Sequence, residues 1–553
     1  MIRYVLPFVL AGALSYWTVG WATFHALHHL LGWEFRAADR AALFAFLVCW
    51  PVIYFGAGWL YRRLVTTPGQ DVFGSARFMG AQRVRALLAG ESSTGLVIGR
   101  EDKQRGRLLR YGGEQHLLTL APTRSGKGVG AVIPNLLTAE RSVLCIDPKG
   151  ENARVTARRR RRFGPVHVLD PFGISGSISA AYNPLDAIDV LSPDAAEDAT
   201  TLADALVSDP PGASEPHWNE EAKALLTGLI LHVAASEEPY RRTLATVREL
   251  VTLAPDRFAR LLEAMQDNVA PRPTGELIAR AANRHLSKSD KEASGVLSAA
   301  QRHTHFLDSP RMGAVMARSD FGFADLKAGT STVFLVLPPD RLDAYGRWLR
   351  LMVAQAIAAM ARSTHKPPSP VLFLLDEFAA LGRLEPVERA MGLMAGYGLQ
   401  LWPILQDLHQ LKSTYGQRAG TFLANAGVTQ VFNVNDVDTA AWVSRALGDT
   451  TLLYETHSMG SSSKSGDWSG EGTTTSEGAS THLARRALLT PDEVRRLRPE
   501  ASLLFLSGEA PILARKVVYH ADPEFRGLFD SPNASAPAPG QPAPTAPIQA
   551  AAE

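Results

Sequence analysis

The chain has 553 residues, which is too long for one ordinary domain and predicts about three or four. Its formal net charge of +2 excludes a protein that binds nucleic acid through a uniformly basic surface, so any basic surface must be local. Its two cysteines, Cys49 and Cys145, both lie in apolar segments, which argues against a disulfide framework and predicts a mainly cytosolic protein.

Two apolar segments lie near the N-terminus. Tyr4–Phe24 and Ala41–Tyr61 contain no charged residue, and each has the ~20 residues that a membrane-spanning helix needs. Arg3 precedes the first segment, and Arg62 and Arg63 follow the second. The positive-inside rule therefore predicts a two-span anchor, residues 1–63, with both ends in the cytoplasm.

From Leu64 onward, apolar runs of strand length alternate with helical patterns. This alternation predicts an α/β fold with a mainly parallel sheet, built from residues 64–182 and 319–530. The expected strands are Leu117–Leu120, Val143–Ile146, Val166–Leu169, Val333–Leu337, Val371–Leu375, Leu401–Leu405 and Val431–Val434.

Residues 183–318 lack strand patterns and show helical periodicity instead. We therefore predict an all-helical domain inserted into the α/β core. The expected helices are Ala196–Leu206, Glu220–Ala235, Thr243–Leu253, Asp256–Met265 and Thr274–Leu286.

The segment after Leu120 has the features of a phosphate-binding loop. An apolar run leads into a Gly/Ser turn, then Lys127, and then a helix-compatible stretch from Val129. In such loops, backbone N–H groups and a helix N-terminus bind an anion, and the lysine neutralises its outer oxygens. The strict pattern wants glycine at Ala121 and a hydroxyl at Gly128, so a simple glycine turn is the alternative. The predicted nucleotide-binding residues are Thr123, Arg124, Ser125, Gly126, Lys127, Gly128 and Val129.

The strand Val371–Leu375 leads directly into Asp376 and Glu377. An apolar strand followed by two acids is typical of the second half of a nucleoside-triphosphatase site. We predict that Asp376 binds Mg²⁺, usually through water, and that Glu377 polarises the attacking water. Acids that merely cap a strand are the alternative.

Two further strands end in polar residues. Gln406 follows Leu405, where it would sense the terminal phosphate or orient the water, although it could equally cap the next helix. Asp147 and Lys149 follow the strand at Val143–Ile146, and we expect them on the nucleotide rim or at a subunit boundary.

Two segments have compositions typical of unstructured chain. Ser458–Ser480 is rich in Ser, Gly and Thr and is predicted to be a flexible loop. Residues 531–553 are rich in Pro and Ala and are predicted to form a disordered tail.

Six motifs in this order resemble the TraG-type coupling ATPases of type IV secretion and conjugation systems. The resemblance spans roughly Met1 to Phe529. The motifs are Gly74-Ser-Ala-Arg77, Ala121-Pro-Thr-Arg-Ser-Gly-Lys-Gly-Val-Gly130, Asp147-Pro-Lys-Gly-Glu151, Leu375-Asp-Glu-Phe378, Gln406-Asp-Leu-His-Gln-Leu411 and Leu488-Leu-Thr-Pro-Asp-Glu493.

The resemblance implies a RecA-like P-loop core, ATP and Mg²⁺ as cofactors, and a homo-hexamer anchored in the bacterial inner membrane. It implies an ATPase that delivers a relaxase–DNA complex, effector proteins or both to the components of a type IV secretion channel. Because Gly128 has no hydroxyl, one Mg²⁺ ligand is unassigned, and water is the expected substitute. The resemblance also implies an arginine finger that reaches across subunits. In some relatives this arginine comes just before a Gly-Tyr-Gly turn, but here the corresponding stretch, Met394–Gly398, contains no arginine. The candidates are therefore Arg124, Arg383 and Arg389.

The five arginines Arg158–Arg162 form the densest positive run of the chain. They could contact lipid headgroups, solvent or DNA, and we rank DNA last because no aromatic residues interleave with them. Two other functions stay open. One is a septal-type translocase of double-stranded DNA, and the other is a nucleotide-binding substrate receptor or gate with negligible turnover.

Overall fold

The structure is a computed structural model that describes residues 17–18, 21–34, 36–45, 71–88, 95–103, 106–207, 216–463 and 473–532. Contacts divide the chain into two compact units. The hairpin unit comprises Met1–Ala76 and Leu447–Leu488, and the core unit comprises Arg77–Ala446 and Leu489–Glu553. All the residues predicted to bind or hydrolyse a nucleotide belong to the core unit.

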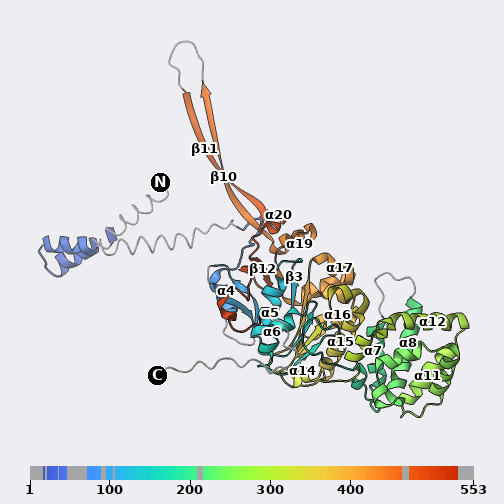
Figure 1. Cartoon of the computed structure of the whole chain (residues 1–553). Helices are drawn as coiled ribbons and strands as arrows, with labels where there is room; N and C mark the ends of the chain where they lie inside the picture. The colour runs from blue at the N-terminus through green and yellow to red at the C-terminus, as the bar shows by residue number, and fades with distance from the viewer. Residues whose placement is uncertain are drawn as a thin grey trace, which may run out of the picture. The chain divides into compact units, whose positions relative to one another are not determined.

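In the described part of the core unit, eleven strands form one sheet (Figure 1). The strand order is β2-β1-β13-β12-β9-β3-β8-β7-β4-β6-β5. Neighbours from β9 to β5 are parallel, and β12, β13, β1 and β2 continue the sheet in antiparallel pairing. The strands are β1 (Leu96–Glu101), β2 (Leu108–Tyr111), β3 (His116–Leu120), β4 (Val143–Asp147), β5 (Val166–Leu169), β6 (Thr332–Val336), β7 (Val371–Leu375), β8 (Leu399–Leu405), β9 (Ala426–Val431), β12 (Ala501–Leu506) and β13 (Ile512–Arg515).

The parallel half of the sheet confirms the predicted α/β fold. β5 and β7 begin and end at the predicted residues, and β3, β4, β6 and β8 differ from prediction by one or two. Every residue of β3, β4, β6, β7 and β8 is buried. Strands covered on both faces need uninterrupted apolar runs, which is why their sequences were easy to recognise.

The predicted strand Val431–Val434 is wrong, because β9 lies earlier, at Ala426–Val431. Gln430, which obscures the apolar pattern, is buried but hydrogen-bonded. Its Oε1 accepts from Thr119 Oγ1 at 2.9 Å, and its Nε2 donates to Ile98 O at 2.9 Å. Asn433 has a left-handed backbone with φ 54°, which an extended strand cannot contain.

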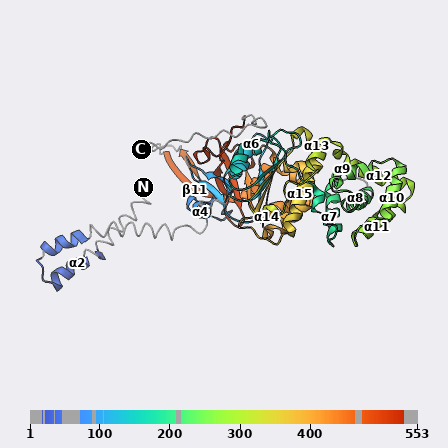
Figure 2. The same ribbon diagram turned by 60° about the horizontal axis from the view of Figure 1, so that its bottom comes forward.

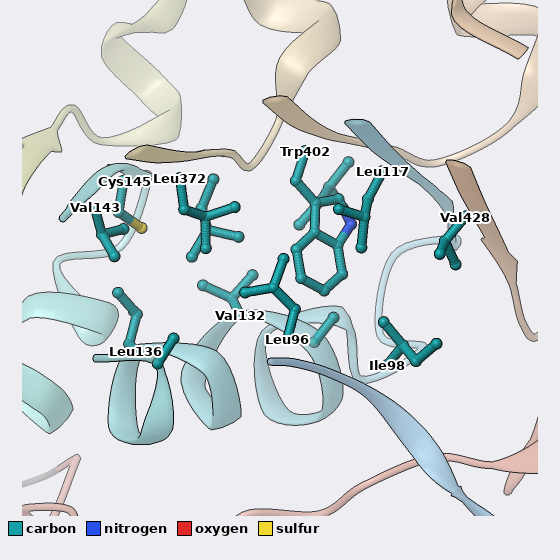
Figure 3. Close-up of a cluster of buried hydrophobic side chains, with 14 of the residues drawn as sticks. Leu96, Ile98, Leu117, Val132, Leu136, Val143, Cys145, Leu372, Trp402 and Val428 are labelled. Atoms are coloured by element: carbon teal, nitrogen blue, oxygen red, sulfur yellow. The ribbon is translucent and has the colours of Figure 1, made fainter. Parts of the chain in front are cut away.

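Helices on one face of the sheet bury its central side chains. Figure 3 shows Leu372, Trp402 and Val428 of the sheet above Val132 and Leu136 of the helical segment that follows β3. The Trp402 indole N–H donates to Thr119 Oγ1 at 2.8 Å, so this buried polar group is satisfied. The helix after β3 is thereby fixed against the strands that flank it.

Between β5 and β6, the described residues form helices and irregular segments but no strand. The first of these helices, α7 (Ala195–Leu206), contacts α15 (Leu342–Arg362) beside the sheet (Figures 1 and 2). The helices from α7 to α14 are α7 (Ala195–Leu206), α8 (Pro216–Ser236), α9 (Leu244–Val251), α10 (Pro255–Gln266), α11 (Thr274–Leu286), α12 (Asp290–Thr304), α13 (Pro310–Val315) and α14 (Asp325–Ala328). The five predicted helices correspond to α7–α11, whereas α12, α13 and α14 were not predicted. The domain boundaries at 183 and 318 remain predictions.

The other α-helices of the core unit and its π-helix lie before β1 or between strands. They are α4 (Ala81–Leu88), the π-helix η3 (Gly128–Val132), α5 (Ile133–Thr138), α6 (Glu151–Arg160), α15 (Leu342–Arg362), α16 (Glu385–Leu393), α17 (Leu408–Tyr415), α18 (Ala419–Asn425), α19 (Val437–Leu447) and α20 (Pro491–Arg495).

The arginine run Arg158–Arg162 is not a uniform basic surface. Arg160 is fully buried, and its guanidinium donates to Ala139 O at 2.6 Å, Arg141 O at 2.5 Å and Thr332 Oγ1 at 2.8 Å. Burial lowers the pKa of Arg160 to about 9. Arg158 pairs with Asp530 at 2.7 Å. Arg160 is therefore structural, which corrects the expectation of a lipid, solvent or DNA contact for this residue, whereas Arg158 is exposed.

We expect Arg160→Met to destabilise the core unit by about 3 kcal/mol or more. A hydrogen bond from a charged donor contributes ~1.5–3 kcal/mol, and the buried guanidinium of Arg160 makes several of them. Chemical denaturation monitored by circular dichroism measures this loss. Arg161→Met is the matched control, because Arg161 is exposed and its loss should change stability by less than ~0.5 kcal/mol. Equal stability of the two variants would contradict the structural role of Arg160.

The hairpin unit contains two long antiparallel strands, β10 (Asp449–Ser463) and β11 (Thr473–Ala487). Their register runs from Asp449↔Ala487 to Ser463↔Thr473. The predicted flexible loop at Ser458–Ser480 is therefore wrong for the paired residues, while 464–472 lie outside the described residues. The hydrogen bonds between paired strands join backbone groups and do not require apolar side chains, and β-branched threonines favour strands. The Ser/Thr-rich composition of this segment therefore did not indicate a loop.

The predicted spans Tyr4–Phe24 and Ala41–Tyr61 lie mostly outside the described residues. Of this region the structure describes short helices, α2 (Trp21–His25) and η2 (Ala26–Leu30) among them. In the part of the chain that is described, no helix has both the length and the apolar character to cross a bilayer. Residues 533–553 of the predicted tail are also outside the described residues.

Candidate functional site

Four neighbouring parallel strands bring the predicted site residues to one edge of the sheet. In the order β3-β8-β7-β4, the strands lead into the loop after Leu120, Gln406, the acids after Leu375, and the end of β4 at Asp147. Parallel strands end at the same edge, so segments that are far apart in sequence meet there. The carboxyl edge of a parallel sheet is the usual ligand-binding edge in α/β folds.

The loop between β3 and η3 has the backbone of an anion-binding turn. Arg124 and Gly126 have left-handed φ values of 62° and 89°. Ser125 N–H donates to Pro122 O at 3.2 Å, and Gly130 N–H donates to Gly126 O at 2.8 Å. Alternation of left- and right-handed residues turns successive N–H groups toward one side, which forms a concave anion site. The buried Ser125 hydroxyl has no hydrogen-bond partner among the described residues.

The residues of the predicted loop differ in their exposure to solvent. Thr123 and Arg124 are exposed, whereas Ser125 is buried and Lys127, Gly128 and Val129 are half-buried. Helix η3 begins at Gly128, so Lys127 lies immediately before the N-terminus of the helical segment. The backbone therefore agrees with the predicted strand–loop–helix order.

Lys127 contacts both acids that follow β7. Its Nζ lies 2.5 Å from Glu377 Oε1 and 3.2 Å from Asp376 Oδ1. Burial opposes the charged ammonium, but attraction to the two carboxylates outweighs it, so the pKa of Lys127 is raised. Burial raises the pKa of Asp376, and although Lys127 opposes this, repulsion from Glu377 adds to it. The site thus holds one ammonium between two carboxylates of unequal burial.

Glu377 has a constrained backbone and two side-chain partners. Its φ of 51° is left-handed, which is unusual for a residue other than glycine, asparagine or aspartate. Besides Lys127, its carboxylate accepts a hydrogen bond from Gln406 Nε2 at 3.3 Å on Oε2. Gln406 N–H donates to Gln410 Oε1 at 2.9 Å, which fixes the backbone at the tip of β8. The structure therefore brings together Lys127, Asp376, Glu377 and Gln406.

Asp147, which we expected on the nucleotide rim or at a subunit boundary, is buried at the end of β4. Its carboxylate is buried and accepts hydrogen bonds from Ala153 N–H at 2.8 Å and Lys149 N–H at 3.3 Å. Burial raises the pKa of Asp147 to about 6, although these amides oppose the rise. Asp147 instead holds the turn into α6, and only Lys149 is exposed.

The candidate arginine fingers have different surroundings. Arg124 is exposed in the loop itself. Arg383 and Arg389 line a cavity of about 420 Å³, which is also lined by α7, α8 and α15. Both have acidic neighbours, since Arg383 lies 3.7 Å from Glu388 and Arg389 lies 3.4 Å from Glu385. The identity of the finger remains a prediction.

The described residues include no cluster of three or more His, Cys, Asp or Glu side chains placed to hold a metal ion. Asp376 is therefore a candidate metal ligand that would need further oxygens from water or a nucleotide. Hard cations such as Mg²⁺ commonly bind in this way, through one or two carboxylates plus phosphate oxygens.

Sequence reasoning missed the contribution of the segment after β13. Val517, Tyr519 and Phe525 pack against Ile133 and other residues of the helix that follows the loop. Lys516 reaches the loop directly, with its Nζ 2.6 Å from Ser125 O. No sequence motif marks this segment. Only its position directly after β13 could have suggested that it contacts the loop.

Gly130, in η3, shows how closely this segment covers the helical segment that follows the loop. A Cβ on Gly130 would lie 2.9 Å from Val517 O, whereas a Cβ on Gly128 would meet nothing within 4 Å. We expect Gly130→Ala to destabilise the core unit by ~1–3 kcal/mol, because a backbone carbonyl cannot move aside cheaply. Thermal unfolding of Gly130→Ala and Gly128→Ala checks this, since the second change should be neutral or stabilising in a helical position. Equal melting temperatures would contradict the packing of Val517 on this helical segment.

Residues 81–539 match the sequence profile of the family described as type IV secretory system conjugative DNA transfer. The chain belongs to this family. Within the conjugative transfer family it is 30% identical over 506 residues to the conjugal transfer protein TraG of Escherichia coli, covering 85% of this chain and 77% of that protein. It is 30% identical over 441 residues to protein VirD4 of Rhizobium radiobacter, covering 78% of this chain and 61% of that protein. The predicted resemblance to TraG-type proteins is confirmed.

Solved structures of the coupling protein TrwB share the fold. The unbound form of TrwBΔN70 superposes with a TM-score of 0.60 at 16% identity, covering 80% of this chain and 93% of that one. TrwB in complex with the ATP analogue ADPNP gives a TM-score of 0.60 at 16% identity, covering 81% and 96%. TrwB has also been solved with ADP and Mg²⁺. These likenesses establish that the chain has the same α/β core fold.

Proposed function

We propose that this protein is an ATPase coupling protein that binds ATP with Mg²⁺ and uses its hydrolysis to deliver substrates to a type IV secretion channel. The observation that carries the proposal is the meeting of Lys127, Asp376, Glu377 and Gln406 beside a left-handed phosphate-type loop. Structures of its fold relative TrwB with ADPNP and with ADP and Mg²⁺ support the choice of ligand.

The residues present fit a magnesium–nucleotide complex. Ser125 has a buried hydroxyl without a partner among the described residues, and the positive φ values of Arg124 and Gly126 form a concave backbone. The loop from Thr123 to Val129 would hold the phosphates, and Asp376 would hold Mg²⁺. When bound, Mg²⁺ neutralises charge that develops on the phosphate oxygens.

Each site residue has a separate task in this proposal. When the nucleotide binds, Lys127 leaves Glu377 and contacts the phosphates instead, because one ammonium cannot make its shortest contact with Glu377 and the phosphates at the same time. Glu377 then has a free carboxylate with which to accept a proton from the attacking water. Gln406, already hydrogen-bonded to Glu377 Oε2, keeps that carboxylate in place and links its position to the tip of β8.

The wider proposal follows the family. We propose that residues 1–63 anchor the protein in the bacterial inner membrane with the core unit in the cytoplasm. We further propose that the inserted helices select the cargo and that six copies form a ring. The cargo would be a relaxase–DNA complex, effector proteins or both. The family's description as conjugative DNA transfer supports the DNA-bound cargo.

ATP hydrolysis by the purified full-length protein in detergent tests the proposal. We expect turnover that is lost when Lys127 or Glu377 is replaced, measured as phosphate release with and without single- and double-stranded DNA. Activity that rises with DNA would favour a motor that engages DNA, and activity independent of DNA would favour protein cargo. Nucleotide binding without turnover, at concentrations where rings form, would instead favour a receptor or gate.

A further inference from the structure

The segment that follows β13 arrives at the same edge of the sheet as the phosphate-type loop. β13 is antiparallel to β12, and β12 is antiparallel to β9, which is parallel to β3. Two reversals of direction make β13 run the same way as β3. Lys516, the first residue after β13, is therefore delivered to the edge at which the loop begins.

Lys516 contacts the loop through its ammonium. Its Nζ donates to Ser125 O at 2.6 Å and to Asn433 Oδ1 at 2.7 Å. It also lies 5.2 Å from the centroid of the Phe432 ring, within the range of a cation–π contact. Asn433, two residues after the end of β9, has a left-handed backbone, and its side-chain amide lies beside Lys516. The Lys516 ammonium is thus held between the backbone of Ser125 and the side chains of Phe432 and Asn433.

The charge of Lys516 is not neutralised by a nearby acid. Among the described residues, no carboxylate oxygen lies within 4.0 Å of its Nζ, whereas Lys127 contacts two carboxylates. Burial lowers the pKa of Lys516, and attraction to Glu500 opposes this only in part. A cation placed at a phosphate-type loop without its own counter-ion adds positive potential where an anion would bind.

The hydrogen bond to Ser125 also controls the direction of an N–H group. Ser125 C=O and Gly126 N–H belong to one planar trans peptide, so they point in opposite directions. An ammonium that holds the carbonyl on one side therefore directs the Gly126 N–H to the other side. The Nζ lies 3.9 Å from the position that a Cβ on Gly126 would occupy, so a side chain at Gly126 would also contact this lysine.

We propose that Lys516 is a positioning residue of the nucleotide site, which holds the Ser125–Gly126 peptide so that Gly126 N–H faces the phosphates and which adds a second positive charge beside the loop. This inference rests on the proposed nucleotide site. It predicts an effect on the binding of ATP and ADP alike, since both carry the phosphates next to the loop. It predicts little effect on the hydrolytic step, because Lys516 contacts neither Asp376 nor Glu377.

The test compares Lys516→Met, Lys516→Arg and Lys127→Ala in the full-length protein, with fluorescent ATP and ADP analogues as probes. For Lys516→Met we expect about tenfold weaker binding of both nucleotides, a KM raised to a similar degree, and a kcat within about threefold of the unaltered protein. Lys516→Arg should restore most of the affinity, because a guanidinium can donate to the same carbonyl. Lys366→Met is the matched control, since Lys366 is exposed and precedes the opposite end of β7.

Asn433→Gly provides a second test that does not remove a charge. Glycine tolerates the left-handed backbone at this position, so the change removes only one acceptor of Lys516. We expect a smaller loss of affinity in the same direction. Unaltered nucleotide affinity in Lys516→Met would overturn the inference, as would a loss that Lys516→Arg does not restore and that follows a lower melting temperature without nucleotide. If the unaltered protein and Lys127→Ala bind nucleotide equally poorly, the proposed function itself fails.

Discussion

Replacing Lys127 with alanine will weaken ATP binding by about a hundredfold or more and remove measurable hydrolysis. In the unaltered protein the ammonium lies between Asp376 and Glu377, and it is the only cation that contacts either of them among the described residues. Its removal leaves two neighbouring carboxylates, one of them buried, facing the place where an anion must bind. A charged hydrogen-bonding group of this kind contributes ~1.5–3 kcal/mol, and the unpaired acids add repulsion.

Titration with a fluorescent ATP analogue and a phosphate-release assay measure the two effects of Lys127→Ala. Lys366→Ala removes the same charge from an exposed position, with a side chain that is 65% exposed, and should leave both quantities unchanged. Hydrolysis that persists in Lys127→Ala would show that the phosphate-type loop is not the site of turnover.

Glu377→Gln should separate binding from hydrolysis. We expect kcat to fall by a factor of roughly 10²–10⁴, the range in which a general base contributes, because an amide cannot accept the proton of water. We expect ATP affinity to be equal or higher. In the free protein the Glu377 carboxylate contacts the Lys127 ammonium at 2.5 Å, and a neutral amide would hold that ammonium less strongly. The variant should therefore accumulate bound ATP.

Single-turnover kinetics and nucleotide titrations of Glu377→Gln distinguish these effects. Glu140→Gln is the matched control, because it makes the same chemical change at an exposed position that precedes the opposite end of β4. A parallel loss of affinity and turnover in Glu377→Gln would show that the carboxylate supports the fold of the site rather than the reaction.

Much of the site could be predicted because its residues follow buried parallel strands. Apolar runs of strand length located β3, β7 and β8, and the polar residues after them had to lie at strand ends. The same reasoning failed for β9, where buried Gln430 is satisfied by Thr119 and Ile98, partners far away in sequence. It also failed for β10 and β11, whose pairing depends on backbone ladders and not on apolar content.

Charge patterns were the least informative part of the sequence. Arg160 stands in a run of five arginines, yet it is the member that is fully buried, because the carbonyls of Ala139 and Arg141 lie where its guanidinium can reach them. Asp147 ends β4 and Asp376 follows β7, but the carboxylate of Asp147 accepts hydrogen bonds from backbone amides of the next turn. Hydrogen-bond partners decided the role of each residue, and these partners are set by packing.

Local sequence patterns were enough to identify the strand–loop–helix around Lys127, the acids after β7 and the family to which the chain belongs. These are properties of short segments, in which backbone conformation and burial follow from neighbouring residues. The contacts of Lys127 with Glu377, 250 positions away, and of Lys516 with Ser125, 391 positions away, depend on the three-dimensional packing. Strand order brings such residues together, and it results from the packing of the whole sheet, which no local pattern specifies.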